Sequence, residues 1–269
     1  GNLLGNIIGG GLILIFYEDL GWSGSLFLLA ALTAMSALQI IFFQEPEDAL
    51  QSPELSTMNN SLFSDLKVFI KQHKRWFIVM ALYPIASTCG FALLNPLLVD
   101  NGWALEDIGF ALKIYGSMVG LVSALLAAPL ISKIGRFHAL INVLVSQAVA
   151  LLLIIPITLG VTDKLMVYSA ITLHFVSFPA LLVVSATIIM DKAAGTHHRA
   201  TFFTLQFSFA SLLGFAYSSL SLAIAQHLGY STVVTVGGAF SLLIVAGIYF
   251  LLRTEQSLRT EQSQALATS

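Results

Sequence analysis

The sequence predicts an all-α protein, a bundle of helices that cross a membrane, and three observations lead to this fold class. Only 10% of the 269 residues are charged, against about 25% in an ordinary soluble domain. Mean hydropathy is +0.88. Long apolar runs contain no Asp, Glu, Lys or Arg, and these are residues 20–44, 76–99, 137–162, 165–190 and 200–252.

Each uncharged run is long enough to cross a bilayer, which takes about 20 mainly apolar residues. The runs are continuously apolar and do not alternate, so we expect helices and not the strands of a barrel. The expected spans number eight, at residues 1–17, 23–43, 76–98, 108–130, 138–160, 165–190, 201–226 and 231–252. The first begins at Gly1 without the basic start of a signal peptide. We therefore interpret the chain as an N-terminally truncated polytopic protein.

Two segments outside the spans are polar. Residues 44–75 open with the acidic, proline-containing stretch "QEPEDALQSPE" and continue with apolar residues at helical spacing. This second half predicts an amphipathic helix that lies at the membrane surface. Residues 253–269 are polar throughout, and we expect a disordered tail.

The distribution of basic residues predicts the orientation in the membrane. If the spans alternate, ten of the twelve fall on one side: Lys67, Lys71, Lys74, Arg75, Lys133, Arg136, Lys192, Arg199, Arg253 and Arg259. The opposite loops hold only Lys164. The linker and the C-terminus are therefore expected to be cytoplasmic. The net charge of −2 and the scattered basic residues give no basic stripe for nucleic acid. The single cysteine, Cys89, has no partner for a metal site.

Three features together resemble the major facilitator superfamily. They are the turn "LGWSGSLFLLAAL", the long linker at 44–75, and "APLISKIGRFHAL". That family has twelve helices in two six-helix halves joined by a cytoplasmic linker. The resemblance implies that residues 1–43 are the last two helices of the N-terminal half. It also implies that residues 76–252 are the six-helix C-terminal half.

The family has a loop motif, Gly-x-x-x-Asp-Arg/Lys-x-Gly-Arg-Arg/Lys, which is repeated between helices eight and nine. Lys133, Gly135 and Arg136 match this second copy. Three positions depart from it, namely Ala128, Ser132 and Phe137. Because Ser132 replaces the aspartate, this copy lacks the acidic residue of the pattern. The resemblance implies a cytoplasmic gating loop, while the simpler interpretation is that the basic residues only set topology.

The segment "MDKAAGTHHRATFFTLQFS" is similar to the helix ten–eleven region of the group of muropeptide permeases and acetyl-CoA transporters. Ferric-siderophore permeases lie near this group. The resemblance implies a monomeric secondary transporter in the bacterial inner membrane, without a cofactor, that moves a small organic solute by alternating access. A siderophore or muropeptide-like anion and protons are the expected partners. The alternatives are a membrane-embedded enzyme such as an acyltransferase, and a drug-efflux permease of the same fold.

Lys113 is the only charged residue inside an expected span. A charge at that depth is costly, so it is a functional candidate. One hypothesis is a cation that faces a central cavity and holds an anionic group of the substrate. The other is a lysine whose amine snorkels to the membrane surface. Because no carboxylate lies deep in any span, an acid for proton coupling is expected outside this chain.

Uncharged polar residues inside the spans are the other cavity candidates. They are Tyr83, Asn95, His174, Gln206, Ser208 and Ser211. A neutral, satisfied core histidine and hydrogen bonding between helices are the simpler interpretations. Pro84 and Pro96 predict breaks in their span.

Glycines repeat every four residues in two of the spans, which lets helix backbones approach closely. Gly1, Gly5 and Gly9 lie on the first span, and Gly116 and Gly120 on the fourth. We therefore expect the first and fourth spans to pack against each other.

Overall fold

A computed structural model describes residues 5–41, 55–196 and 198–267 of the chain. All regular structure in these ranges is helical, which confirms the all-α prediction. The elements are η1 (Asn6–Leu12), α2 (Ile13–Ile15), α3 (Tyr17–Ile41), α4 (Leu55–Gln72), α5 (Lys74–Thr88), α6 (Phe91–Asp100), α7 (Leu105–Ile108), η3 (Gly109–Tyr115), α8 (Gly116–Leu152), α9 (Ile154–Thr158), α10 (Lys164–Ala194), α11 (Arg199–Leu228) and α12 (Tyr230–Ala267). The two η elements are π-helices.

Five helical segments in the described ranges are long and apolar enough to cross a membrane: Lys74–Asp100, Leu105–Thr158, Lys164–Ala194, Arg199–Leu228 and Tyr230–Arg253. The second has 54 residues, about 81 Å of helix, far more than one crossing needs. It turns at Gly135, where φ is 78°. The five segments therefore cover the six spans expected over residues 76–252. A shorter apolar helix, Asp19–Met35, overlaps the span expected at 23–43.

The span expected at 76–98 is broken, but not at its prolines. Pro84 and Pro96 both lie inside helices, and the break between α5 and α6 falls at Cys89 and Gly90. A β-carbon at Gly90 would lie 1.7 Å from Leu151 Cδ1, so a residue without a side chain is needed there. The prediction of breaks at the two prolines is wrong, because both prolines lie inside helices and the interruption falls between them.

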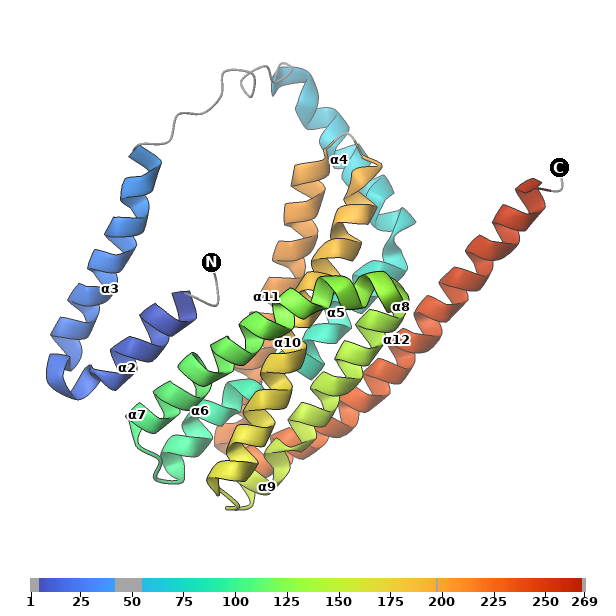
Figure 1. Cartoon of the computed structure of the whole chain (residues 1–269). Helices are drawn as coiled ribbons and strands as arrows, with labels where there is room; N and C mark the ends of the chain where they lie inside the picture. The colour runs from blue at the N-terminus through green and yellow to red at the C-terminus, as the bar shows by residue number, and fades with distance from the viewer. Residues whose placement is uncertain (1–4, 42–54, 197, 268–269) are drawn as a thin grey trace. The chain divides into compact units, whose positions relative to one another are not determined.

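The chain divides into two compact units. The first comprises residues 1–72 and 104–117, and the second comprises residues 73–103 and 118–269. In the first unit, η1 packs on η3 and α2 contacts α7. In the second, α5 lies between α11 and α12 and packs against both, as Figure 1 shows. The core of the second unit is apolar and fully buried around Trp76, Met80, Leu140, Leu144, Leu181 and Ile248.

Both polar segments contain a helix, which was expected for the second half of the linker but not for the C-terminal segment. α4 occupies the second half of the linker from Leu55, while the acidic stretch 44–54 lies outside the described residues. α12 continues as a helix to Ala267, where we expected a disordered tail from residue 253. Glu, Gln, Leu, Arg and Ala are good helix formers. They fill most of this segment, so the last span extends into it without a break.

Candidate functional site

Lys113 lies in η3, where it is half-buried beside η1. A β-carbon at Gly11 of η1 would lie 3.2 Å from Lys113 Cβ and 2.7 Å from Ile114 Cγ1. The two π-helices therefore meet at Gly11, with Lys113 at their contact. π-Helical turns are rare and often occur at functional sites. Within the described ranges no carboxylate pairs with Lys113, so its charge is available to an anion.

Gly5 and Gly9, the glycines of the first span that we expected at this contact, lie in more open surroundings than Gly11. A β-carbon at Gly5 would meet no described atom within 4 Å, and one at Gly9 would meet only Leu29 Cδ2, at 3.8 Å. Gly116 and Gly120 are both buried. The glycine pattern therefore predicted which two helices pack together. It did not include Gly11, the glycine with the tightest surroundings at their contact.

His174 lies in the middle of α10 with 6% of its surface exposed. Its ring stacks on Phe91 at 3.5 Å between centroids with an interplanar angle of 4°, and on Phe178 at 5.3 Å and 13°. The space beside it, between His174, Phe91 and Gln147, has no room for a water molecule. Among the described residues the imidazole makes ring contacts and no hydrogen bond. This geometry favours a packed core histidine over a residue that faces an open cavity.

Gln206 is fully buried and joins α11 to α5. Its side-chain oxygen accepts the indole N–H of Trp76 at 3.0 Å, and its amide donates to the carbonyl of Phe202 at 2.9 Å. About three turns further along α11, the hydroxyl of Tyr217 donates to the carbonyl of Ala81 at 2.9 Å. The amide of Gln206 thus ties two helices together.

The remaining cavity candidates do not form one cluster. Tyr83 is buried on α5 with 7% exposed, and Ser211 is half-buried on α11. Asn95 and Ser208 are exposed, on α6 and α11. None of these four lines either of two pockets that lie between α8 and α10.

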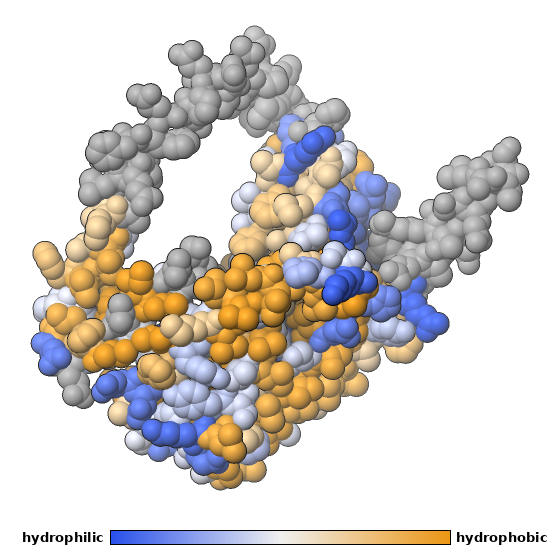
Figure 2. Space-filling view, in the orientation of Figure 1, coloured by the Kyte–Doolittle hydropathy of each residue, from blue (hydrophilic) through white to orange (hydrophobic). Residues whose placement is uncertain are grey.

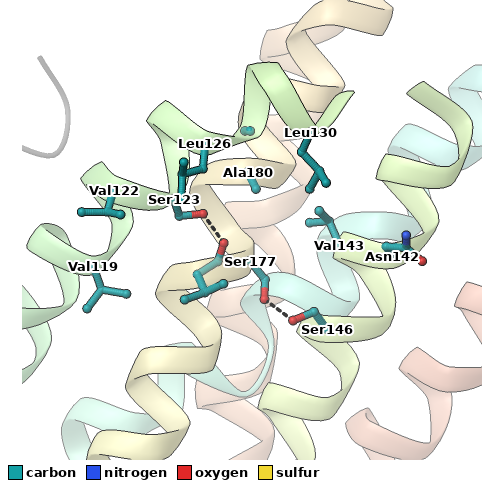
Figure 3. A pocket seen from close by; sticks show the side chains of 12 residues that line it. Val119, Val122, Ser123, Leu126, Leu130, Asn142, Val143, Ser146, Ser177 and Ala180 are labelled. Carbon is teal, nitrogen blue, oxygen red and sulfur yellow. Dashed lines mark hydrogen bonds between the residues drawn. The ribbon is translucent and has the colours of Figure 1, made fainter. Parts of the chain in front are cut away.

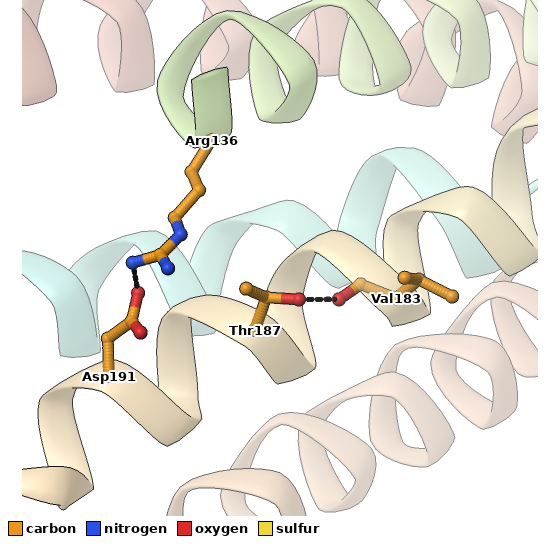
Figure 4. A network of polar contacts seen from close by, with 4 residues as sticks. All are labelled: Arg136, Val183, Thr187 and Asp191. Carbon is orange, nitrogen blue, oxygen red and sulfur yellow. Dashed lines mark hydrogen bonds and ion pairs between the residues drawn. The ribbon is translucent and has the colours of Figure 1, made fainter. Parts of the chain in front are cut away.

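The predicted gating loop is a sharp turn closed by an ion pair (Figure 4). α8 reverses at Gly135, whose φ of 78° and ψ of 158° favour glycine. The next residue, Arg136, reaches across to the carboxylate of Asp191 in the last turns of α10. Lys133 is exposed on the same turn. Arg136 of the motif is therefore paired with an acid from another helix, while Ser132 stands at the acidic position of the motif itself.

Sequence reasoning missed Asp191, although a signal was present. The acid ends a long uncharged run in "IIMDKAAG" and lies on the same side of the membrane as the motif if the spans alternate. The two side chains are 53% and 41% exposed. An exposed pair of this kind contributes at most about 1 kcal/mol to stability.

Two pockets lie between the two arms of α8 and α10, and sequence reasoning did not predict them. The larger has a volume of about 640 Å³, and Val122, Ser123, Leu126, Ser146, Ser177 and Ala180 are among its lining residues (Figure 3). The other, of about 610 Å³, includes Arg136 and Thr187 in its wall. Both volumes are in the range of ligand sites.

An all-helical bundle of uncharged spans, with a glycine–arginine turn closed by an ion pair, defines a multi-pass membrane protein. The chain belongs to the Major Facilitator Superfamily, whose family model matches residues 1–218. This confirms the family that the sequence resembles. Because that superfamily consists of transporters, the membrane-enzyme alternative is set aside.

Individual relatives point to one group within the superfamily. The chain is 24% identical over 243 residues to "Putative transporter AmpG 3" of Rickettsia prowazekii (strain Madrid E), which covers 87% of this chain and 57% of that protein. It is 27% identical over 145 residues to "Anhydromuropeptide permease" of Escherichia coli (strain K12), covering 52% of this chain and 29% of that protein. These relatives confirm the similarity to the muropeptide-permease group. The chain spans little more than half the length of the Rickettsia protein.

Proposed function

We propose that the protein is a secondary active transporter that moves a muropeptide-like organic anion across the bacterial inner membrane by alternating access. The observation that carries this proposal is the superfamily match over residues 1–218, together with the similarity to a protein named a muropeptide permease. The fold is consistent with it, because apolar helices satisfy their own backbone polar groups and can therefore cross the bilayer several times.

The charge of Lys113 supports an anionic substrate. It is the one charged residue within an expected span, and no described carboxylate neutralises it. Attraction between charges is several times stronger in a region of lowered dielectric than in water. An anionic group of the solute, such as a carboxylate, is the complementary partner. Coupling to protons is part of the proposal.

The turn at Gly135 supports a gating role for Lys133, Gly135 and Arg136. The ion pair of Arg136 with Asp191 joins the turn of α8 to the end of α10. Because the pair is partly exposed, it costs little to break and to form again. We propose that it forms in one state of the transport cycle and separates in another, on the cytoplasmic side.

The test is uptake by the full-length protein reconstituted into liposomes as a monomer. Radiolabelled anhydromuropeptide is offered while an imposed pH gradient, alkaline inside, drives proton entry. We expect saturable uptake that a protonophore abolishes. Uptake of a ferric siderophore, without uptake of the muropeptide, would show that the substrate is a siderophore. Extrusion of hydrophobic cations with no uptake of either anion would identify a drug-efflux permease and overturn the proposal.

A further inference from the structure

The two pockets lie end to end along one face of α10. Val176 and Ala180 line the apolar pocket, and Val183 and Thr187 line the other. Asp191 follows one turn later on the same face, since residues three and four apart are neighbours on a helix. The distance along α10 from Val176 to Asp191 is about 22 Å at 1.5 Å per residue. This equals about half the full thickness of a bilayer, which is the depth of one leaflet.

The deeper pocket presents an apolar wall although serines line it. Ser177 donates its hydroxyl to the carbonyl of Leu173 at 2.6 Å and lies 2.6 Å from the hydroxyl of Ser146. The hydroxyl of Ser123 donates to the carbonyl of Val176 (Figure 3). No charged residue is among those that line this pocket. The hydroxyls of these three serines are thus satisfied within the protein, and the amide of Asn142 is the one other polar side chain in the lining. The rest of the wall is apolar, so the free volume suits a hydrocarbon chain.

The outer end of the same groove is positively charged. Arg136 lines the second pocket and Lys133 lies on the same turn, while Asp191 is the acid that pairs with Arg136. Two positive charges against one negative charge leave a net charge of +1 at this end. Figure 2 shows the same gradient, with hydrophobic residues along α8 and hydrophilic residues at its turn. Basic pockets between spans at a membrane surface bind lipid headgroups.

We propose that the groove between α8 and α10 is a binding site for one anionic phospholipid of the adjacent leaflet. An acyl chain fills the apolar pocket beside Leu126 and Ala180, and the headgroup phosphate binds at Arg136 and Lys133. The phosphate competes with Asp191 for the guanidinium of Arg136. The lipid therefore favours the state of the turn in which the ion pair is open.

The experiment measures lipid binding to the purified, delipidated full-length protein by native mass spectrometry, with phosphatidylglycerol and phosphatidylcholine as probes. Leu126→Trp fills the apolar pocket. Its matched control is Leu125→Trp, the preceding leucine, which is 70% exposed and does not line the pocket. Arg136→Gln removes the positive charge that is proposed to bind the headgroup phosphate. Its control is Lys164→Gln, at the other end of α10.

We expect one tightly bound phosphatidylglycerol per protein. Leu126→Trp should abolish tight binding of the lipid while Leu125→Trp leaves it unchanged. Arg136→Gln should weaken the binding of phosphatidylglycerol about fivefold, the effect of losing one cation near the surface. It should leave the binding of phosphatidylcholine unchanged. Asp191→Asn removes the carboxylate that competes with the phosphate for Arg136, and should strengthen the binding of phosphatidylglycerol. Equal binding by the Leu126 and Leu125 variants, or an equal preference for the two lipids in the unaltered protein, would overturn the proposal. Because binding is the readout, this result does not depend on the transported substrate.

Discussion

Gly11 of η1 and Ile114 of η3 pack against each other without room for a side chain at Gly11. A β-carbon at Gly11 would lie 2.7 Å from Ile114 Cγ1, a separation that real side chains do not tolerate. Gly5, on the same helical segment, has no described atom within 4 Å of such a carbon. The pair of glycines offers a matched comparison of tight and open positions at one helix contact.

Gly11→Ala should destabilise the protein by about 1–3 kcal/mol, the usual cost of overpacking a tight contact. The same change at Gly5 should have little effect, because space is available there. Thermal unfolding of the purified protein in detergent measures both variants. Equal melting temperatures for the two would show that η1 and η3 do not meet at Gly11.

Replacing Lys113 tests whether its charge holds the substrate. Lys113→Ala should abolish uptake of the anion, because no other cation lies within the same span. Lys113→Arg keeps the charge but does not release a proton. It should retain exchange of substrate across the membrane and lose uptake driven by protons. Lys164→Ala, at the exposed start of α10, is the control for a lysine outside the spans. Uptake by Lys113→Ala within about twofold of the unaltered protein, at equal expression, would leave snorkelling as the explanation.

Gln206→Leu should destabilise the second unit. The substitution leaves the buried indole N–H of Trp76 without the acceptor that it meets at 3.0 Å. An unsatisfied buried donor costs about 1–3 kcal/mol. Ser208→Ala on the same helix changes an exposed residue and serves as control. The measurement is again thermal unfolding, and a Gln206→Leu protein as stable as the control would contradict the structural role of this amide.

Charge reversal tests the gate. Arg136→Glu and Asp191→Arg should each slow transport, because each brings like charges together at the turn of α8. The double variant restores an ion pair of opposite polarity and should recover much of the rate. Stability should change by less than about 1 kcal/mol throughout, because both side chains are partly exposed. A double variant slower than either single variant would rule out a direct pairing role.

Labelling with a membrane-impermeant thiol reagent tests the orientation. In a Cys89→Ser background, a cysteine at Ser56 should react only from the cytoplasmic side, and a cysteine at Asn101 only from outside. The reason is the excess of basic residues on the side of the linker. The reverse pattern would overturn the orientation. Reaction of both sites from one face would overturn the number of spans between them.

Much of this protein was predictable because bilayer hydropathy is a local property. An uncharged run of about 20 residues must be a helix in lipid, since every backbone polar group must bond within its own segment. The spans over 76–252, the family and the candidate Lys113 follow from composition and short motifs. The turn at Gly135 also lies within one short motif, and the structure places a positive φ there.

Tertiary structure alone decided which residues meet. Asp191 pairs with Arg136 from another helix, and Leu151 packs so closely on Gly90 that no side chain fits there. Neither partner is near in sequence, so no local pattern marks the contact. The same reason applies to His174 and Gln206, two polar residues in similar apolar runs. Stacking on Phe91 and a bond to Trp76 place both in the core, because the packing of neighbouring helices determines whether a polar side chain faces a partner or a cavity.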